Sequence, residues 1–310
     1  MNKKNYLIEK AEKGLTIQQY LKQIAGFSNA QIRSMKFTEN GICLGGQRAR
    51  VTTRLSEGDV LEVLLETKNS SSAHLLSFEQ MPDILYEDTD VIAVNKPAGM
   101  AVHPSHGHYQ DTLANQLAYY FRENTQQVEI HSIGRLDLET SGIVLFAKHR
   151  AAAARLSRQR EDGRLQKTYL AICSGIFAEK NGTLNGAIAP LPGSLMKMCV
   201  SKDGKPAVTH YQVQKQYMEA ALVQLTLETG RTHQIRVHMA DAGHPLIGDR
   251  LYFADTDQKA DVDAENCFTG IKRAALHASR ICFYQPFEGK RITVEVPFPE
   301  DMKKCLFRDE

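Results

Sequence analysis

The amino-acid sequence predicts an α+β protein, with a mixed, largely antiparallel sheet in its larger part and a small α/β module before it. Three observations lead to this class. The length of 310 residues allows one to two domains with a large core. Strand-like runs outnumber helical ones after residue 78, where only a few helices are inserted between strands. A Ser-rich stretch separates that part from a shorter N-terminal region with two helical patterns.

The N-terminal region, 1–67, is expected to begin with two short helices. Residues 15–24 carry apolar side chains at helical spacing. Ser28 is typical of the residue that caps a helix, and it precedes a second helical pattern. Three strands and one turn are expected after the helices, with the strands at 41–44, 47–51 and 60–65 and the turn at 56–59.

The larger domain is expected over 78–310, after a linker assigned to 68–77. The stretch 67–73 is polar, Ser-rich and free of periodicity, which is typical of a flexible linker. Residues 255–265 carry five acids and few apolar residues, which predicts a mobile surface loop. The expected strands are 84–86, 91–94, 143–148, 168–173, 207–214, 221–228 and 292–296, and the expected helices are 112–121, 151–160 and 232–242.

Composition indicates a soluble, cytoplasmic protein. Apolar residues make up 42% of the chain and charged residues 24%, which is ordinary for a globular protein. No apolar run approaches the roughly 18 residues that a membrane span needs. The first residues contain lysines without a long apolar region after them, so no signal peptide is expected. The six cysteines are scattered and form no CxxC pair, which favours a reduced compartment.

Positive charge is concentrated at the N-terminal end. Residues 1–70 hold 11 lysines and arginines against 7 acids, whereas the rest of the chain holds slightly more acids than bases. Such asymmetry is typical of a module that binds a polyanion, with a merely solvated basic surface as the alternative.

The segment 131–142 carries the strongest chemical signal. It places the carboxylate of Asp137 two residues after Arg135, and the apolar run 143–147 that follows is typical of a buried strand. A carboxylate held beside a cation at a loop–strand junction can act as a nucleophile or a base. The alternative is an aspartate that only stabilises a turn.

This segment, with Gly134-Arg-Leu-Asp137 and Thr140-Ser-Gly142, resembles the catalytic motif of RluA-type RNA pseudouridine synthases. Three other parts of the chain match the same family in the same order, at 91–99 with His103-Pro104 after it, at 167–171, and at 229–238 with 243–249. The family usually has His immediately before Arg-Leu-Asp, where this chain has Gly134, as RsuA-type enzymes tend to have. The resemblance implies the pseudouridine synthase fold and an isomerisation that needs no cofactor or metal.

The resemblance also implies roles for six residues of the larger domain. Asp137 matches the essential carboxylate, and Arg236 matches the arginine that pairs with it. Tyr169 matches a tyrosine that stacks on the uracil and helps to move the ring proton. Arg135, Ile235 and Lys96 are expected near the extruded nucleotide, with Ile235 beneath the base and Lys96 on a phosphate. Surface ion pairs, core packing and a solvated turn are the alternatives for these side chains.

The N-terminal region resembles the small RNA-binding domain named after ribosomal protein S4. Its order of two helices, a Gly-rich hairpin and a Glu-Gly-Asp turn carries this resemblance. The basic side chains that are expected to contact phosphates are Arg33, Lys36, Arg48 and Arg50. A capping subdomain without an RNA role is the alternative.

The partner that these resemblances imply is RNA, with 23S ribosomal RNA as the leading target and transfer RNA as the alternative. Two other functions stay open, namely a non-catalytic RNA-binding or ribosome assembly factor on the same fold, and a hydrolase that uses Asp137 with a histidine. No membrane partner is expected, and we expect a monomer. Neither of the two histidine groups, at 103–108 and at 233–244, has a cysteine or acid that would complete a zinc site, so no metal is expected.

Overall fold

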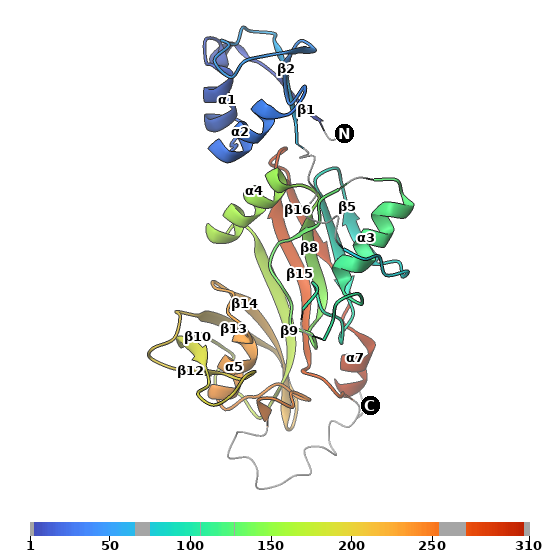
Figure 1. Cartoon of the computed structure of the whole chain (residues 1–310). Coiled ribbons are helices and arrows are strands. Elements are labelled where there is room, and N and C mark those ends of the chain that lie inside the picture. Colours follow the sequence, from blue (N-terminus) through green and yellow to red (C-terminus); the bar gives the residue numbers. More distant parts are fainter. Residues whose placement is uncertain (1–2, 66–74, 106, 127, 254–270, 307–310) are drawn as a thin grey trace.

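The computed structural model describes residues 3–65, 75–105, 107–126, 128–253 and 271–306. It consists of a small N-terminal module and a larger part that is built on one long sheet (Figure 1). The predicted linker, 68–77, lies mostly outside the described residues, as does the predicted acidic loop at 255–265. Within the described residues no helix has the length and apolar character that crossing a membrane requires.

The N-terminal module has a four-stranded antiparallel sheet with the order β1-β4-β2-β3. Both predicted helices form, and the side chains of Thr16 and Ser28 accept a hydrogen bond from the backbone of Gln19 and Gln31 at their first turns. The elements are β1 (Lys3–Leu7), a 3-10 turn η1 (Lys10–Glu12), α1 (Ile17–Gln23), α2 (Asn29–Phe37), β2 (Ile42–Leu44), β3 (Gln47–Arg48) and β4 (Val60–Leu64). The hydrophobic cluster of the module consists of its own residues together with Ala151 of the larger part.

The larger part is organised around a ten-stranded sheet with the order β10-β13-β14-β9-β15-β8-β6-β5, to which β16 and β7 add at β15 and β8. All pairs are antiparallel except β8 with β15, so the predicted mixed, largely antiparallel sheet and the α+β class are confirmed. The strands are β5 (Asp83–Glu87), β6 (Val91–Lys96), β7 (His131–Ser132), β8 (Ser141–Ala147), β9 (Gln166–Ser174), β10 (Asn181–Asn185), β13 (Val208–Gln216), β14 (Ala220–Leu227), β15 (Leu276–Tyr284) and β16 (Arg291–Glu295).

Helices cover both faces of the centre of this sheet. One face packs against α3 (Leu113–Glu123) and α5 (Gln234–Asp241), and the other packs against α4 (Arg150–Glu161). Successive residues of β6 and β8 therefore enter opposite clusters, as Val144 and Leu145 do. Burial on both faces explains why these two strands are continuous apolar runs rather than alternating ones.

Two smaller elements complete the larger part. A separate hairpin of β11 (Ile188–Pro190) and β12 (Met198–Val200) lies beside α5. The C-terminal helix α7 (Glu300–Leu306) packs on a further hydrophobic cluster that includes Ile172 and Ile247.

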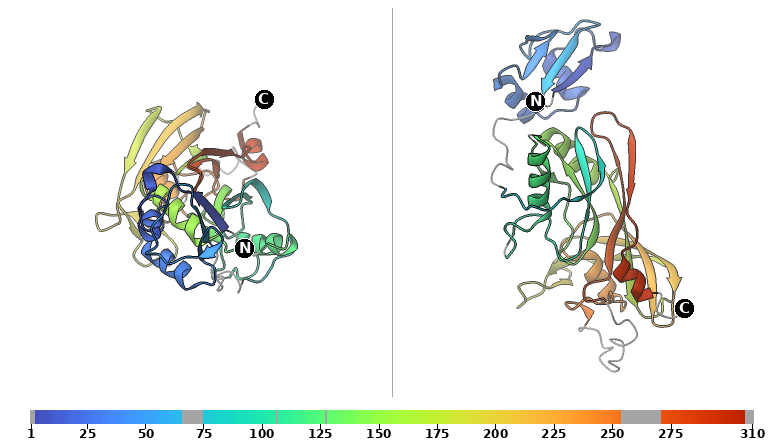
Figure 2. Two further views of the ribbon diagram at one scale, coloured as in Figure 1. Left: turned by 90° about the horizontal axis from the view of Figure 1, so that it is seen from above. Right: turned by 90° about the vertical axis from the view of Figure 1, so that its right-hand side faces the viewer.

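The N-terminal module docks on the end of the larger part where α4 and the β15–β16 hairpin lie, as both views of Figure 2 show. Phe287, in the turn of that hairpin, packs against the hydrophobic cluster of the module. The guanidinium of Arg155 lies 4.0 Å from the centre of the Phe287 ring. Lys4 of the module reaches the buried carboxylate of Asp90 at 3.3 Å. Asp90 also accepts hydrogen bonds from Gln285 at 2.6 Å and, at 2.9 Å, from Nε2 of His149.

Candidate active site

The loop that carries Asp137 connects β7 to β8. Gly134 in this loop has a φ angle of +85°, and Gly142, the second residue of β8, has a φ angle of +108°. A side chain at Gly142 is excluded, because a Cβ atom there would lie 2.3 Å from the carbonyl oxygen of Ala278 on the neighbouring strand β15. The parallel pairing of β8 with β15 thus brings the Asp137 loop close to the centre of the sheet.

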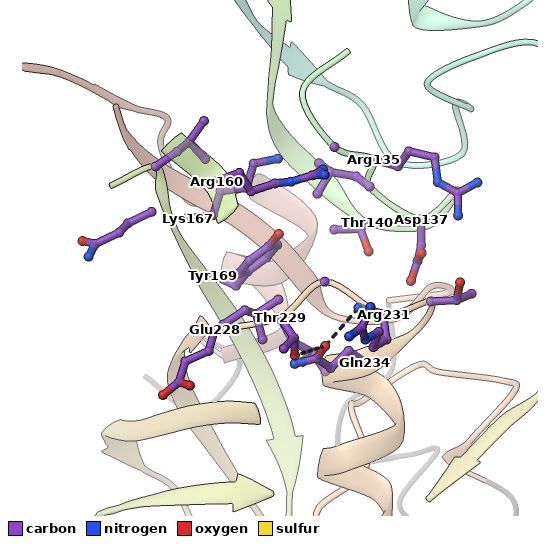
Figure 3. Close-up of a pocket in the computed structure, with 18 of the residues that line it drawn as sticks. Arg135, Asp137, Thr140, Arg160, Lys167, Tyr169, Glu228, Thr229, Arg231 and Gln234 are labelled. Carbon is purple, nitrogen blue, oxygen red and sulfur yellow. Dashed lines mark hydrogen bonds between the residues drawn. The ribbon is translucent and has the colours of Figure 1, made fainter. Parts of the chain in front are cut away.

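A pocket of about 830 Å³ opens beside this loop. Figure 3 shows Asp137 across the pocket from Tyr169, with Arg231 and Gln234 below them. The pocket is lined by the Asp137 loop, the end of α4, strand β9 and the segment 227–236. Five of the residues that the sequence predicted therefore line one cavity, namely Arg135, Asp137, Tyr169, Ile235 and Arg236.

Arg236 lies between two aspartates. Its Nη1 is 3.8 Å from Oδ2 of Asp137, whereas Nε and Nη2 donate to the carboxylate of Asp249 at 2.6 and 2.7 Å. The side chain of Asp137 is 28% exposed, and that of Asp249 is fully buried. The carboxylate of Asp137 is thus accessible from the pocket. The partner that binds Arg236 most tightly is the buried carboxylate of Asp249.

Asp249 stabilises the charged form of Arg236. Burial alone would lower the pKa of Arg236, but the hydrogen bonds and charge of Asp249 raise it, with Asp137 adding to the effect. Asp249 also accepts hydrogen bonds from the backbone amides of Leu251 and Tyr252. No role was predicted for Asp249 from the sequence, although this residue ends the motif segment at 243–249, and that position was the available signal.

Tyr169 and Ile235 form the apolar wall of the pocket. The two residues are 7% and 4% exposed and belong to the same hydrophobic cluster. Burial raises the pKa of Tyr169, and the negative charge of Asp137 raises it further. The phenol is therefore neutral at physiological pH, and Tyr169 can offer a ring face and a hydroxyl proton but not a phenolate.

Lys96 braces the Asp137 loop from beneath. Its side chain is fully buried, and its ammonium donates to the carbonyl oxygens of Pro97, Met100 and Leu138 at 2.9, 2.7 and 3.1 Å. Burial lowers the pKa of Lys96 to about 7, and the charge of Asp137 opposes this shift. The three N–H groups of the Lys96 ammonium are directed at the backbone rather than into the pocket, a geometry that does not favour the predicted phosphate contact.

Arg135 is exposed at the rim of the pocket, and His233 caps α5 in a left-handed conformation with φ of 55°. Nδ1 of His233 lies 2.9 Å from the hydroxyl of Tyr252.

Among the described residues no group of three or more His, Cys, Asp or Glu side chains is arranged to hold a metal ion.

The four basic residues predicted to contact phosphates all lie on the surface of the N-terminal module. Arg33 and Lys36 are exposed on α2, and Arg48 and Arg50 are exposed in and after β3. Arg48 donates to the carbonyl oxygen of Lys36 at 3.2 Å, which brings the two elements together. All four are thus exposed basic side chains of the module, and their contact with RNA stays a prediction.

Comparison with known proteins gives matches over most of the chain. A family model described as RNA pseudouridylate synthase matches residues 90–241. The RNA pseudouridine synthase YhcT of Bacillus subtilis is 39% identical over 251 residues, which are 80% of this chain and 78% of the relative. The ribosomal large subunit pseudouridine synthase D of Neisseria meningitidis is 38% identical over 267 residues, which are 85% of this chain and 67% of the relative. The solved structure of human RNA pseudouridylate synthase domain containing 1 is similar, with a TM-score of 0.57 and 26% identity over 77% of this chain and 90% of that one.

Proposed function

Because the chain belongs to the RNA pseudouridine synthase family, it is an isomerase, and we propose that it converts a uridine of 23S ribosomal RNA to pseudouridine with Asp137 as the essential residue. One observation carries the proposal. Asp137 offers its carboxylate to a pocket whose other wall is Tyr169, with the guanidinium of Arg236 at 3.8 Å. A fixed carboxylate supported by a buried cation suits a nucleophile or a base.

The reaction moves the ribose from N1 to C5 of the uracil. The bond between C1′ and N1 breaks, the base turns, a bond forms between C1′ and C5, and the hydrogen of C5 leaves as a proton while N1 gains one. No atom is added and no electron is transferred, so the balance requires no redox partner. The uridine must leave its stack to reach the pocket, and this is less costly in loops and bulges of RNA.

Each wall of the pocket has a task in this proposal. Tyr169 stacks on the extruded uracil, and its neutral hydroxyl assists the transfer of the C5 proton. Ile235 supports the base from the other side, and Arg236 balances the charge of Asp137. Arg135, at the rim, meets the RNA beside the extruded nucleotide.

Ribosomal RNA is the proposed target on two grounds. The relative in Neisseria meningitidis is named as a large-subunit enzyme. The N-terminal module exposes four basic side chains to which the phosphates of a structured RNA can bind, namely Arg33, Lys36, Arg48 and Arg50. The proposal places the activity in the cytoplasm and treats the chain as a monomer, with transfer RNA as the alternative target.

The test is a map of pseudouridines in total RNA from cells with and without the gene, made by carbodiimide labelling and reverse-transcription stops. We expect one or more sites of 23S ribosomal RNA to disappear without the gene and to return with the wild-type chain. A site that disappears from transfer RNA would replace the proposed target. A map without any change would instead favour a non-catalytic RNA-binding factor.

A further inference from the structure

Two cations converge on the space beside Gly134, at the edge of the pocket. A Cβ atom built on Gly134 would lie 3.6 Å from Nη1 of Arg160 and 3.9 Å from Nζ of Lys167. Arg160 lies in the last turn of helix α4, and Lys167 lies near the start of strand β9, two residues before Tyr169. Figure 3 shows both side chains above Tyr169.

No carboxylate neutralises this pair among the residues that the structure describes. Glu161 and Asp162 follow Arg160 in the chain and also line the pocket. Asp162 is bound by Arg164 through two contacts of 2.6 and 2.9 Å. Burial and the charge of Arg160 lower the pKa of Lys167 to about 8. Two like charges that are held together without a counter-ion are stabilised when an anion binds between them.

Gly134 is the position where this chain departs from the usual RluA pattern. Any side chain there would begin in contact with both cations, because its Cβ atom would lie within 4 Å of Arg160 and Lys167. The positive φ of +85° also favours glycine. With glycine at this position, the cationic groups of Arg160 and Lys167 lie against the backbone of the Asp137 loop, and both residues line the pocket.

We propose that Arg160 and Lys167 form a phosphate-binding subsite that holds the RNA backbone beside the target nucleotide. This inference rests on the proposed function, since it assumes an RNA strand in the pocket. A phosphodiester between a guanidinium and an ammonium accepts charge-assisted hydrogen bonds from both. The subsite acts on binding and register of the strand rather than on the chemical step.

The experiment compares the full-length wild type with the double variant Arg160→Gln/Lys167→Gln. Tritium release from RNA labelled at C5 of uridine is measured, with total RNA from cells lacking the gene as substrate. Because a phosphate contact contributes mainly to affinity, we expect KM to rise about tenfold while kcat stays within about twofold. The plot of log(kcat/KM) against log[KCl] should become shallower by about 0.7 to 0.9 for one lost phosphate contact.

The matched control is Arg158→Gln, which removes an exposed arginine of the same helix that does not line the pocket. The single variant Arg160→Gln, at an exposed position, gives a second measurement if the double variant does not fold. A KM and a salt slope that equal those of the control would overturn the subsite, as would a loss confined to kcat. Absence of tritium release by the wild type would instead reject the proposed function.

Discussion

Asp249 holds Arg236 through two charge-assisted hydrogen bonds, from Nε at 2.6 Å and from Nη2 at 2.7 Å. The planar guanidinium is thereby fixed, and its remaining nitrogen, Nη1, faces Asp137 at 3.8 Å. The position of the cation that supports the proposed catalytic carboxylate is therefore set by a second, buried carboxylate.

Substitution of Asp249 should reduce turnover although Asp137 is untouched. In Asp249→Asn the guanidinium loses its charged partner and its fixed orientation, so we expect kcat to fall about a hundredfold with little change in KM. The fall in kcat is measured by tritium release, and thermal unfolding checks that the variant is folded. The control is Glu139→Gln, where the carboxylate lies 3.8 Å from Arg236 and is half-buried. A kcat that falls equally in both variants would contradict the special role of Asp249.

Substitution of Lys96 should loosen the Asp137 loop. Lys96→Met leaves the carbonyl oxygens of Pro97, Met100 and Leu138 without their buried donor, which should lower the free energy of unfolding by about 3 kcal/mol. Urea unfolding measures the change, and Lys202→Met at an exposed position serves as the control. An unfolding free energy equal to that of the control would show that the ammonium does not brace the loop.

Tyr169 should act only as a neutral phenol. Burial and the charge of Asp137 raise the pKa of Tyr169, so its hydroxyl keeps its proton across the neutral range. A plot of kcat against pH should therefore show no increase below about pH 10 that is due to ionisation of Tyr169.

The substitution Tyr169→Phe keeps the ring that stacks on uracil and removes the hydroxyl. We expect kcat to fall about a hundredfold with KM little changed. A Phe variant with full turnover would limit Tyr169 to stacking.

Asp90 links the docking of the N-terminal module to pH. Burial alone would raise the pKa of Asp90, but hydrogen bonds from His149 and Gln285 and the charge of Lys4 lower it from 3.8 to about 2. The carboxylate thus contributes stability that is fully present above about pH 4 and is lost as pH falls toward 2.

The difference in unfolding free energy between wild type and Asp90→Asn should therefore shrink by about 2 kcal/mol between pH 6 and pH 2. Urea titrations of both proteins at the two pH values measure this. A difference that stays constant over this range would contradict the role of the Asp90 carboxylate.

Much of the fold was predictable because it depends on local patterns. The buried strands β6 and β8 and helices α3, α4 and α5 appear close to the expected residues, since apolar runs and helical spacing reflect burial directly. Strand β15 was not predicted, although it is central, because His277, Ser279 and Arg280 interrupt its apolar pattern. Strand β1 was also missed, since an edge strand with alternating exposure has few apolar residues.

The candidate site was predictable in its membership but not in its contacts. The motif residues Asp137, Tyr169 and Arg236 come from three separate segments, and the structure brings them to one pocket, while their roles stay predictions. The partner of Arg236 was not predictable, because Asp249 reaches it only through the fold. For Lys96 the sequence predicted a phosphate contact. It could not show that the side chain is buried, because a lysine in a turn is usually exposed.

The most direct test of the central claim is the conversion of uridine by the purified chain. Total RNA from cells lacking the gene is incubated with the wild type or with Asp137→Asn, and pseudouridine is quantified by nucleoside chromatography of the ribosomal fraction. We predict new pseudouridine with the wild type and none with Asp137→Asn, with thermal unfolding and RNA binding of the variant measured as controls. Equal pseudouridine formation by both proteins would contradict the assignment of Asp137 as the essential residue.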